Sequence, residues 1–286
     1  MDEKDLLGEK FEAYRAHLRR VAYRMLGSQT EADDAVQEAW LRLSRQDAGG
    51  IDNLGGWLTT VVARVCLDML RSRKSRREEP MDEHVPEPAA TDDAEQEALL
   101  ADSVGLALHV VLQTLAPAER VAFVLHDMFA VPFDDIAPIV GRSPAATRQL
   151  ASRARRRVQG TPAVPSEEIT RQQEVVDAFL AASRNGDFAG LLAVLDPDVV
   201  MRADEAAVRL EGSAELRGAT AVAQAFKGRA RSAQSALVNG AVGVVVAPRG
   251  QLLLVLNVTI ANGRITAIEV TADPERLDRF DLAVLT

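Results

Sequence analysis

The chain has 286 residues, of which 47% are hydrophobic and 26% are charged, and its formal net charge at pH 7 is −9. This is the composition of an ordinary soluble globular protein with room for two or three domains. No apolar run approaches the roughly 20 residues of a membrane span, and the N-terminus is unlike a signal peptide. The single cysteine, Cys66, excludes an internal disulfide and a cysteine-based metal site. We therefore expect a cytoplasmic protein.

The first 76 residues predict three helices. The first has apolar residues at helical spacing: Phe11, Tyr14, Leu18, Val21 and Met25. "GSQT" interrupts it, and Thr30 is a suitable N-cap for the second helix, which has an acidic and polar face opposite its apolar one. A glycine-containing loop then leads to the third helix, which ends in "RSRKSRR" (71–77), with five basic residues and no acid.

Residues 78–97 hold nine acids and no base and are rich in proline, which predicts an unstructured linker. Helices resume at about residue 99. "FDDIAPIV" (133–140) is a short helix, Gly141 forms a turn, and Ser143 caps a last helix that reaches about Val158. A short helix, a glycine turn and a capped second helix are typical of the helix-turn-helix.

The second helix of this pair concentrates positive charge in an acidic protein. "GRSPAATRQLASRARRRVQ" (141–159) has six arginines and no acid. Its apolar side is predicted to pack inward, while arginine and glutamine side chains on the other side can hydrogen-bond purine edges and neutralise phosphates. Two basic segments divided by an acidic one suggest a polyanion held at two places. The alternative is that both are merely solvated helix faces.

The ordered motifs of residues 8–159 resemble a bacterial sigma factor of the extracytoplasmic-function (ECF) type, in the sigma-70 family. "DDAVQEAWLRL" resembles region 2.2, "GGWLTTVVARVCLDMLRSRK" resembles regions 2.3 and 2.4, and the segment from "LAPAERVAF" to "RARRRV" resembles region 4. The resemblance implies binding to the β′ clamp helices and β flap of core RNA polymerase, together with promoter DNA. It also implies opening and reading of the −10 element and reading of the −35 element.

The resemblance assigns roles to three groups of residues. The polymerase-binding group is Asp34, Gln37, Glu38 and Leu41. The −10 group is Asn53, Trp57, Thr60, Arg64, Arg71, Arg73, Lys74 and Arg76. The −35 group is Arg142, Ser143, Thr147, Arg148, Gln149, Ser152, Arg153 and Arg156. Trp57 could instead anchor the core, which leaves Asn53 and its loop as the base contact. Arg64 stands where many relatives carry asparagine, so their −10 base preference is not transferred.

Beyond a Pro-rich linker at 160–169 the pattern changes. Helical segments and β-rich runs alternate, and "ANGR" predicts a hairpin because Asn-Gly tolerates positive φ. This predicts an α+β domain with a mostly antiparallel sheet. Residues 170–286 resemble a SnoaL-like, cone-shaped domain of the kind fused to one group of ECF sigma factors. The resemblance makes it regulatory, through loop residues Asp204, Asp273, Pro274 and Arg276.

The whole chain is therefore predicted to be multidomain, with two all-α sigma domains and a C-terminal α+β domain. The predicted bounds are 8–77 for the region 2 helical bundle, 78–98 for the acidic linker, 99–159 for the region 4 helix-turn-helix and 170–286 for the C-terminal domain. No cofactor, metal or catalytic residue is expected. No histidine, tyrosine or cysteine lies in the C-terminal domain to pair with Asp204 in proton transfer, although Arg202 or Arg209 could be a remnant of such a pair.

Two other functions remain open at this stage. One is a ligand-responsive regulator whose polymerase contacts have decayed, and the other is a DNA-tethered SnoaL-like ligand-binding protein or enzyme. The pocket that comes with this fold would admit a small ligand. The acidic face of the second helix favours the sigma factor, because a simple repressor would not need it.

Overall fold

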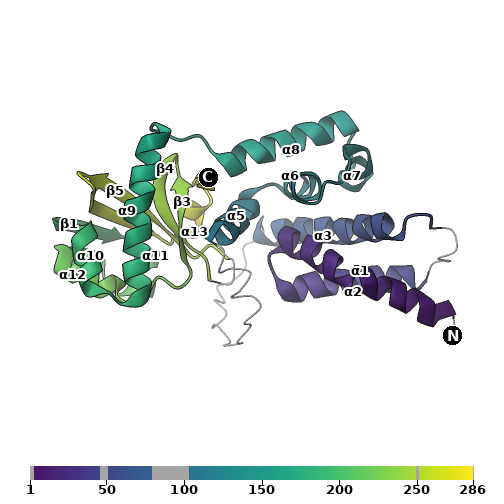
Figure 1. The fold of residues 1–286 in the computed structure, drawn as a ribbon, viewed down its shortest axis with the longest axis horizontal. Coiled ribbons are helices and arrows are strands. Elements are labelled where there is room, and N and C mark those ends of the chain that lie inside the picture. Colours follow the sequence, from purple (N-terminus) through teal and green to yellow (C-terminus); the bar gives the residue numbers. More distant parts are fainter. Residues whose placement is uncertain (1–2, 46–50, 79–102, 249–250, 286) are drawn as a thin grey trace. The chain divides into compact units, whose positions relative to one another are not determined.

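The computed structural model describes residues 3–45, 51–78, 103–248 and 251–285 (Figure 1). The predicted acidic linker lies almost wholly outside them. The chain forms two compact units. The first comprises Met1–Asp92 and Leu115–Arg155, and the second comprises Asp93–Thr114 and Arg156–Thr286. None of the described helices is long and apolar enough to cross a lipid bilayer.

Three long helices form one part of the first unit: α1 (Glu3–Leu26), α2 (Gln29–Leu43) and α3 (Leu54–Glu78), each packed on the other two. The helix predictions are confirmed, but the cap of α2 is Ser28, whose Oγ accepts a hydrogen bond from Glu31 N–H at 3.4 Å. Gly27, with φ +80°, ends α1 and leaves Ser28 extended. Thr30 therefore lies inside the first turn, and its predicted capping role is wrong.

The rest of the first unit is the helix-turn-helix region. It contains α6 (Pro117–Phe123), the π-helical segment η2 (Val124–Met128), α7 (Phe133–Val140) and the greater part of α8 (Pro144–Gln159). Gly141 joins α7 to α8 with φ +69°, as predicted from its place in the sequence. Helices α6 and α7 pack on α3, and Arg120 Nη1 donates to the carbonyl of Met25 at 3.0 Å. The two predicted helical domains thus share one packed unit.

The second unit is built on a seven-stranded sheet with the order β2-β1-β6-β5-β4-β3-β7. Its strands are β1 (Leu195–Ala203), β2 (Glu215–Arg217), β3 (Ala233–Val238), β4 (Ala241–Val246), β5 (Leu254–Ala261), β6 (Arg264–Thr271) and β7 (Leu282–Ala283). All neighbouring strands are antiparallel except β1 and β6. The predicted α+β class with a mostly antiparallel sheet is confirmed.

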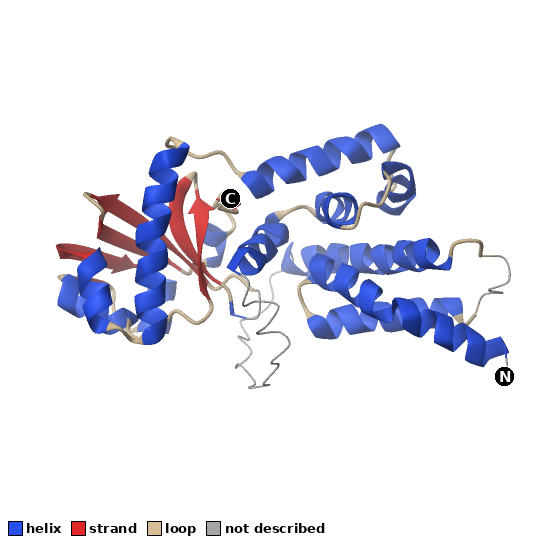
Figure 2. Cartoon of the chain, in the orientation of Figure 1, coloured by secondary structure: helices blue, strands red, loops and turns tan. Residues whose placement is uncertain are grey.

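Helices accompany the sheet: α9 (Ser166–Asn185), α10 (Phe188–Val194), α11 (Glu205–Glu211), α12 (Ala219–Phe226) and the one-turn α13 (Pro274–Leu277). Helix α9 runs across one face of the sheet (Figure 2) and packs on β3 and β4. Phe179 of α9, Val244 of β4 and Ile268 of β6 belong to the buried core. The predicted "ANGR" hairpin joins β5 to β6, with Asn262 at φ +53° and Gly263 at φ +74°.

Two boundaries differ from the predictions. Helix α5 (Ser103–Thr114) belongs to the second unit, where it packs on β3 and β7 (Figure 1), and not to the helix-turn-helix unit. The linker predicted at 160–169 is shorter, because α9 begins at Ser166 and its Ile169 is buried in the core. Ala163 N–H donates to Gly240 O at 2.8 Å and Val284 N–H to Val158 O at 2.9 Å, so this stretch is attached to the sheet domain.

Candidate polymerase and nucleic-acid interfaces

One face of α2 gathers the predicted polymerase-binding residues. Asp34, Gln37 and Leu41 are exposed and Glu38 is half-buried, and spacings of three and four residues place all four on one side of the helix. Glu38 pairs with Arg42 at 2.8 Å. Leu41 is one of few large apolar side chains left substantially exposed in the described chain, at 39%. The α2 face therefore combines carboxylates with an apolar side chain, which suits docking on a basic helical surface.

The outward side of α8 carries most of the predicted −35 group. Ser143 caps the helix, since its Oγ accepts from Ala146 N–H at 3.2 Å. The other exposed members are Arg142, Arg148, Gln149, Ser152, Arg153 and Arg156. Thr147 differs, because it is fully buried and its hydroxyl donates to the carbonyl of Ser143 at 2.9 Å. Its place three residues after the capped start turns it toward the core, so its predicted DNA contact is corrected to a packing role.

Carboxylates of the first unit hold part of the basic helix. Arg153 pairs with Glu119 at 3.0 Å, and Arg155 pairs with Asp127 through its Nε at 2.8 Å. The guanidinium of Arg148 lies over the ring of Phe133, 5.2 Å from its centroid. Sequence reasoning did not identify Glu119 and Asp127, because they are remote from α8 along the chain. These pairs orient the arginine side chains and lower the positive charge available for DNA.

The start of α3 holds four members of the predicted −10 group. Asn53 Oδ1 accepts a hydrogen bond from Gly56 N–H at 2.9 Å and so caps α3, and Asn53 remains exposed. Trp57 and Thr60 are half-buried, and the Thr60 hydroxyl donates to the carbonyl of Gly56 at 3.0 Å. Arg64 is exposed one turn further along. Trp57 is thus neither a fully buried anchor nor a free surface ring.

The basic end of α3 is divided between internal and external roles. Arg71 is exposed and lies 3.9 Å from Asp68. Arg73 instead turns inward: its Nε donates to Glu31 at 2.9 Å and its Nη1 to the carbonyl of Leu26 at 3.1 Å. It joins α3 to the α1–α2 connection, and its predicted phosphate contact is therefore replaced in this structure by a structural one. The side chains of Lys74 and Arg76 lie outside the described residues.

In the second unit, Asp204 brings two distant loops together. Its Oδ1 accepts from the N–H groups of Ala207 at 2.9 Å and Ala272 at 3.2 Å, and its Oδ2 from Asp273 N–H at 3.2 Å and Arg276 Nη1 at 3.4 Å. Burial alone would raise the pKa of this carboxyl, but the three backbone donors and the Arg276 charge hold it below its ordinary value. We call this set of bonds the Asp204 clasp.

The clasp includes the residues predicted to be regulatory. Asp273 caps α13 and Pro274 opens it. The stretch at 204–208, predicted as a loop, is the start of α11, with Asp204 as its N-cap. Arg202 pairs with Glu215 at 3.1 Å and not with Asp204, so the suggested pair of Asp204 with Arg202 does not form. Both carboxylate oxygens of Asp204 accept hydrogen bonds from structural donors.

Comparison with known proteins decides the family. Residues 11–76 match sigma-70 region 2 and residues 105–158 match sigma-70 region 4. The ECF RNA polymerase sigma factor SigJ of Mycobacterium tuberculosis is 38% identical over 93% of this chain and 92% of its own. The chain belongs to the ECF RNA polymerase sigma factors. The probable ECF sigma factor SigI of the same species is 37% identical over 97% of each chain.

The crystal structure of M. tuberculosis SigJ covers 94% of this sigma factor and 97% of its own chain, at 35% identity and a TM-score of 0.46. The region 4 match extends over both units of the present sigma factor, since α5 lies in the second unit and most of α8 in the first. Sequence reasoning placed α5 in region 4 from its position in the chain. Its packing partners, β3 and β7, are more than 100 residues away.

The sigma factor has no site for metal or thiol chemistry among its described residues. Its described residues contain no group of three or more histidine, cysteine or acidic side chains placed to hold a metal ion. Cys66 is buried in α3, and burial raises the pKa of its thiol to about 12. The thiolate is the reactive form of cysteine, so this side chain acts as a core residue.

The Asp204 clasp leads to a stability prediction. Asp204→Ala is expected to lower the free energy of unfolding of the second unit by about 2–3 kcal/mol, since it removes an N-cap and leaves partly buried N–H groups unpaired. Asp187→Ala is the matched control: Asp187 caps α10 through one bond, to Gly190 N–H at 2.9 Å, and should cost only about 1 kcal/mol. Urea unfolding of both variants measures the difference.

The same carboxyl gives the sign of a pH effect. Its pKa is lower in the folded chain than the ordinary value of 3.8, so its stabilising contribution is present at neutral pH and is lost as pH falls through the folded value. The gap in stability between wild type and Asp204→Ala should therefore shrink below about pH 4. An equal stability gap between wild type and Asp204→Ala at pH 7 and pH 3 would show that the charge of Asp204 contributes nothing and that the residue acts only as a neutral N-cap.

Proposed function

We propose that this sigma factor binds core RNA polymerase through the α2 face, with the β′ clamp helices as the partner surface. The observation that carries the proposal is the set of four neighbouring positions 34, 37, 38 and 41 on one side of α2, because it joins carboxylates to an exposed leucine. Carboxylates would steer the encounter with basic helices and set its orientation, and Leu41 would supply apolar contact. The chain would act in the cytoplasm, where the polymerase is.

Promoter DNA is the second proposed partner. Arg148 and Gln149 near the start of α8 would read base edges of the −35 element, and Arg142 and Arg156 would hold phosphates. Asn53, Trp57 and Thr60 at the start of α3 would hold an unpaired base of the −10 element, with Arg64 and Arg71 on the strand. The net positive charge of α8 supports this division, as does the exposure of Arg148, Gln149, Asn53 and Arg64. The β flap of the polymerase would receive the region 4 helices.

We also propose that the second unit regulates and does not catalyse. Asp204 is the one described acid of this unit with a clearly lowered pKa apart from the exposed Glu215, and it is engaged by structural donors in the clasp. No histidine, tyrosine or cysteine follows residue 126 in the sequence. The packing of α5 on β3 and β7 supports regulation, since a helix within the region 4 match is held by the sheet domain.

Base readout by α8 is tested by comparing three single variants in run-off transcription with core polymerase. Arg148→Ala and Gln149→Ala are expected to lose about 1–3 kcal/mol of discrimination between a matched and a mutated −35 element. Arg156→Ala, the control on the same exposed side, should weaken all promoters alike and reduce the dependence on salt. Full −35 discrimination in both the Arg148 and Gln149 variants would mean that another face of the helix enters the groove.

A further inference from the structure

One arginine of the −35 group is held differently from its neighbours on α8. Carboxylates pair with Arg153 and Arg155, and each pair offsets part of the positive charge of the helix. The guanidinium of Arg148 lies instead over the ring of Phe133, the first residue of α7, 5.2 Å from its centroid. Among the described residues no carboxylate pairs with Arg148. The face of an aromatic ring attracts a cation without cancelling its charge, so Arg148 is oriented and keeps its full charge for DNA.

A second ring supports Phe133 from the π-helical segment η2. His126 stacks on Phe133 with 3.8 Å between the ring centroids and 27° between the ring planes. Its Nδ1 lies 3.1 Å from the carbonyl oxygen of Val131. Because a carbonyl oxygen only accepts, Nδ1 carries a proton and donates it, which fixes the orientation of the imidazole. We call the two stacked rings, His126 and Phe133, the Arg148 platform.

The turn between η2 and α7 brings the carbonyl of Val131 back to His126. Ala130 adopts the left-handed conformation, with φ +55°, which is uncommon for a residue other than glycine. Ala130 N–H donates to His126 O at 3.1 Å, and Val131 N–H donates to Leu125 O at 2.9 Å. π-Helical segments and non-glycine residues with positive φ recur at functional sites. The platform is therefore built into the backbone before DNA arrives.

We propose that the Arg148 platform positions the Arg148 guanidinium for its base contact in the −35 element, which makes Phe133 and His126 positioning residues for promoter reading. This inference rests on the proposed base readout by Arg148. An unrestrained arginine side chain has many rotamers, and fixing one of them when a base is contacted weakens binding. Arg148 over Phe133 has lost much of that freedom already. A mutated −35 element offers no such contact, so pre-ordering favours the matched element alone.

Competition binding by the holoenzyme, the full-length chain with core RNA polymerase, tests the proposal on one promoter and its −35 point mutants. Phe133→Leu removes the ring and should lower discrimination against the base change that Arg148→Ala fails to detect, by about three- to tenfold. Phe133→Tyr keeps the ring and should discriminate as the wild type does. The double variant Phe133→Leu with Arg148→Ala should lose no more than Arg148→Ala alone, because the platform acts only through Arg148.

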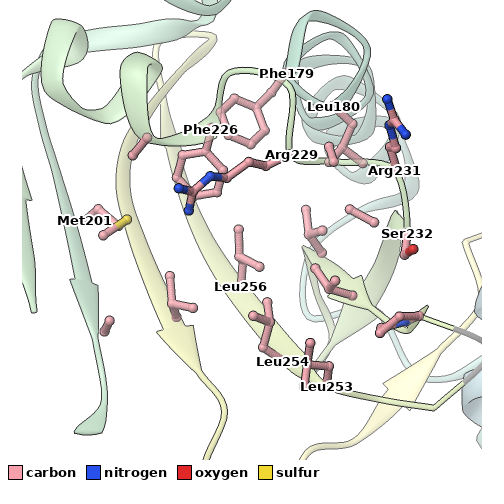
Figure 3. Close-up of a pocket in the computed structure, with 18 of the residues that line it drawn as sticks. Phe179, Leu180, Met201, Phe226, Arg229, Arg231, Ser232, Leu253, Leu254 and Leu256 are labelled. Carbon is pink, nitrogen blue, oxygen red and sulfur yellow. The ribbon is translucent and has the colours of Figure 1, made fainter. Parts of the chain in front are cut away.

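A second platform variant and a matched control separate positioning from folding. His126→Leu removes the stacked ring and the Nδ1 bond, and should lower discrimination in the same way but to a smaller extent. Phe226→Leu makes the same substitution as Phe133→Leu at a half-buried phenylalanine of the second unit. Phe226 lines an apolar cavity of ≈ 270 Å³ and contacts Phe179 with 5.1 Å between ring centroids (Figure 3). This control should leave discrimination unchanged, and urea unfolding identifies variants that fold as the wild type does.

Three results would overturn the proposal. Full discrimination in folded Phe133→Leu and His126→Leu chains would show that the platform does not position Arg148. A double variant whose loss equals the product of the two single losses would show that Phe133 acts independently of Arg148. Both of these results leave base readout by Arg148 in place. Full discrimination in Arg148→Ala would overturn that base readout together with the role of the platform.

Discussion

The double variant Asp34→Arg with Glu38→Arg is expected to lose stable binding to core RNA polymerase. Both residues lie on the α2 face. Reversing their two charges changes the net charge of that face by +4, opposite a basic partner surface. Like charges across an interface cost several kcal/mol, so the affinity should fall at least about a hundredfold. Co-elution with core polymerase in gel filtration, and titration at two salt concentrations, measure the loss. The variant should also fail in run-off transcription on every promoter.

The control makes the same change in net charge at another place on the chain. Glu9 and Glu12 are exposed acids on α1, and Glu9→Arg with Glu12→Arg makes the same change in total charge away from the α2 face. This variant should bind polymerase nearly as well as the wild type. If the two double variants lose affinity equally, the effect comes from overall charge. If the Asp34 and Glu38 variant still co-elutes, the docking surface is not on α2.

The sequence predicted the helices and strands wherever a local pattern decides them. Helical spacing of apolar residues predicted α1, α2 and α3, and the Asn-Gly pair at 262 and 263 predicted the β5–β6 turn. Gly141 between two short helices predicted the helix-turn-helix. These features depend on residues close together in the chain, where side-chain period and backbone preference act directly. The same reasoning placed the α2 face on a single side of its helix.

Predictions failed where the outcome depends on distant residues. Arg73 was assigned to phosphates as one of five basic residues in a run, but Glu31 and the carbonyl of Leu26 hold it inside the first unit. Thr147 was assigned to DNA from its place in the motif, although its side chain is buried. Asp204 was predicted to be a regulatory loop residue, free to contact other parts of the protein. Its four donors come from α11 and from the segment near residue 273, and only folding brings them together.

The position of α5 was also beyond local reasoning, because nothing in its sequence distinguishes packing on a sheet from packing on helices. Leu106, Val110 and Leu112 of this apolar helix are buried, and packing on helices would bury them as well as packing on a sheet does. In the structure the partners are β3 and the short C-terminal strand β7, which pairs with β3 through Val238 and Leu282. The last residues of the chain thus complete the surface on which a helix of the region 4 match rests.

Removal of residues 161–286 is therefore expected to change promoter opening strongly and to expose α5. The truncation deletes both strands on which this helix packs, and each fully buried leucine or valine contributes about 1.5–3 kcal/mol through its burial. The truncated chain should bind a hydrophobic dye that the full-length protein does not bind. It should also form open complexes to a markedly different extent at matched concentration, since α5 is then free to move with the rest of region 4.

The Asp204→Ala variant is the matched control for this effect. It loosens the clasp within the second unit but leaves β3, β7 and α5 in place, so dye binding and open-complex formation should stay close to the wild type. Fluorescence of the dye and permanganate footprinting of one promoter compare the three proteins. If the truncated chain opens the promoter as the full-length chain does and binds no dye, the sheet domain neither supports α5 nor regulates the sigma factor. If Asp204→Ala changes opening as much as the truncation does, regulation acts through the clasp, because that variant keeps the α5 contact and the truncation loses both.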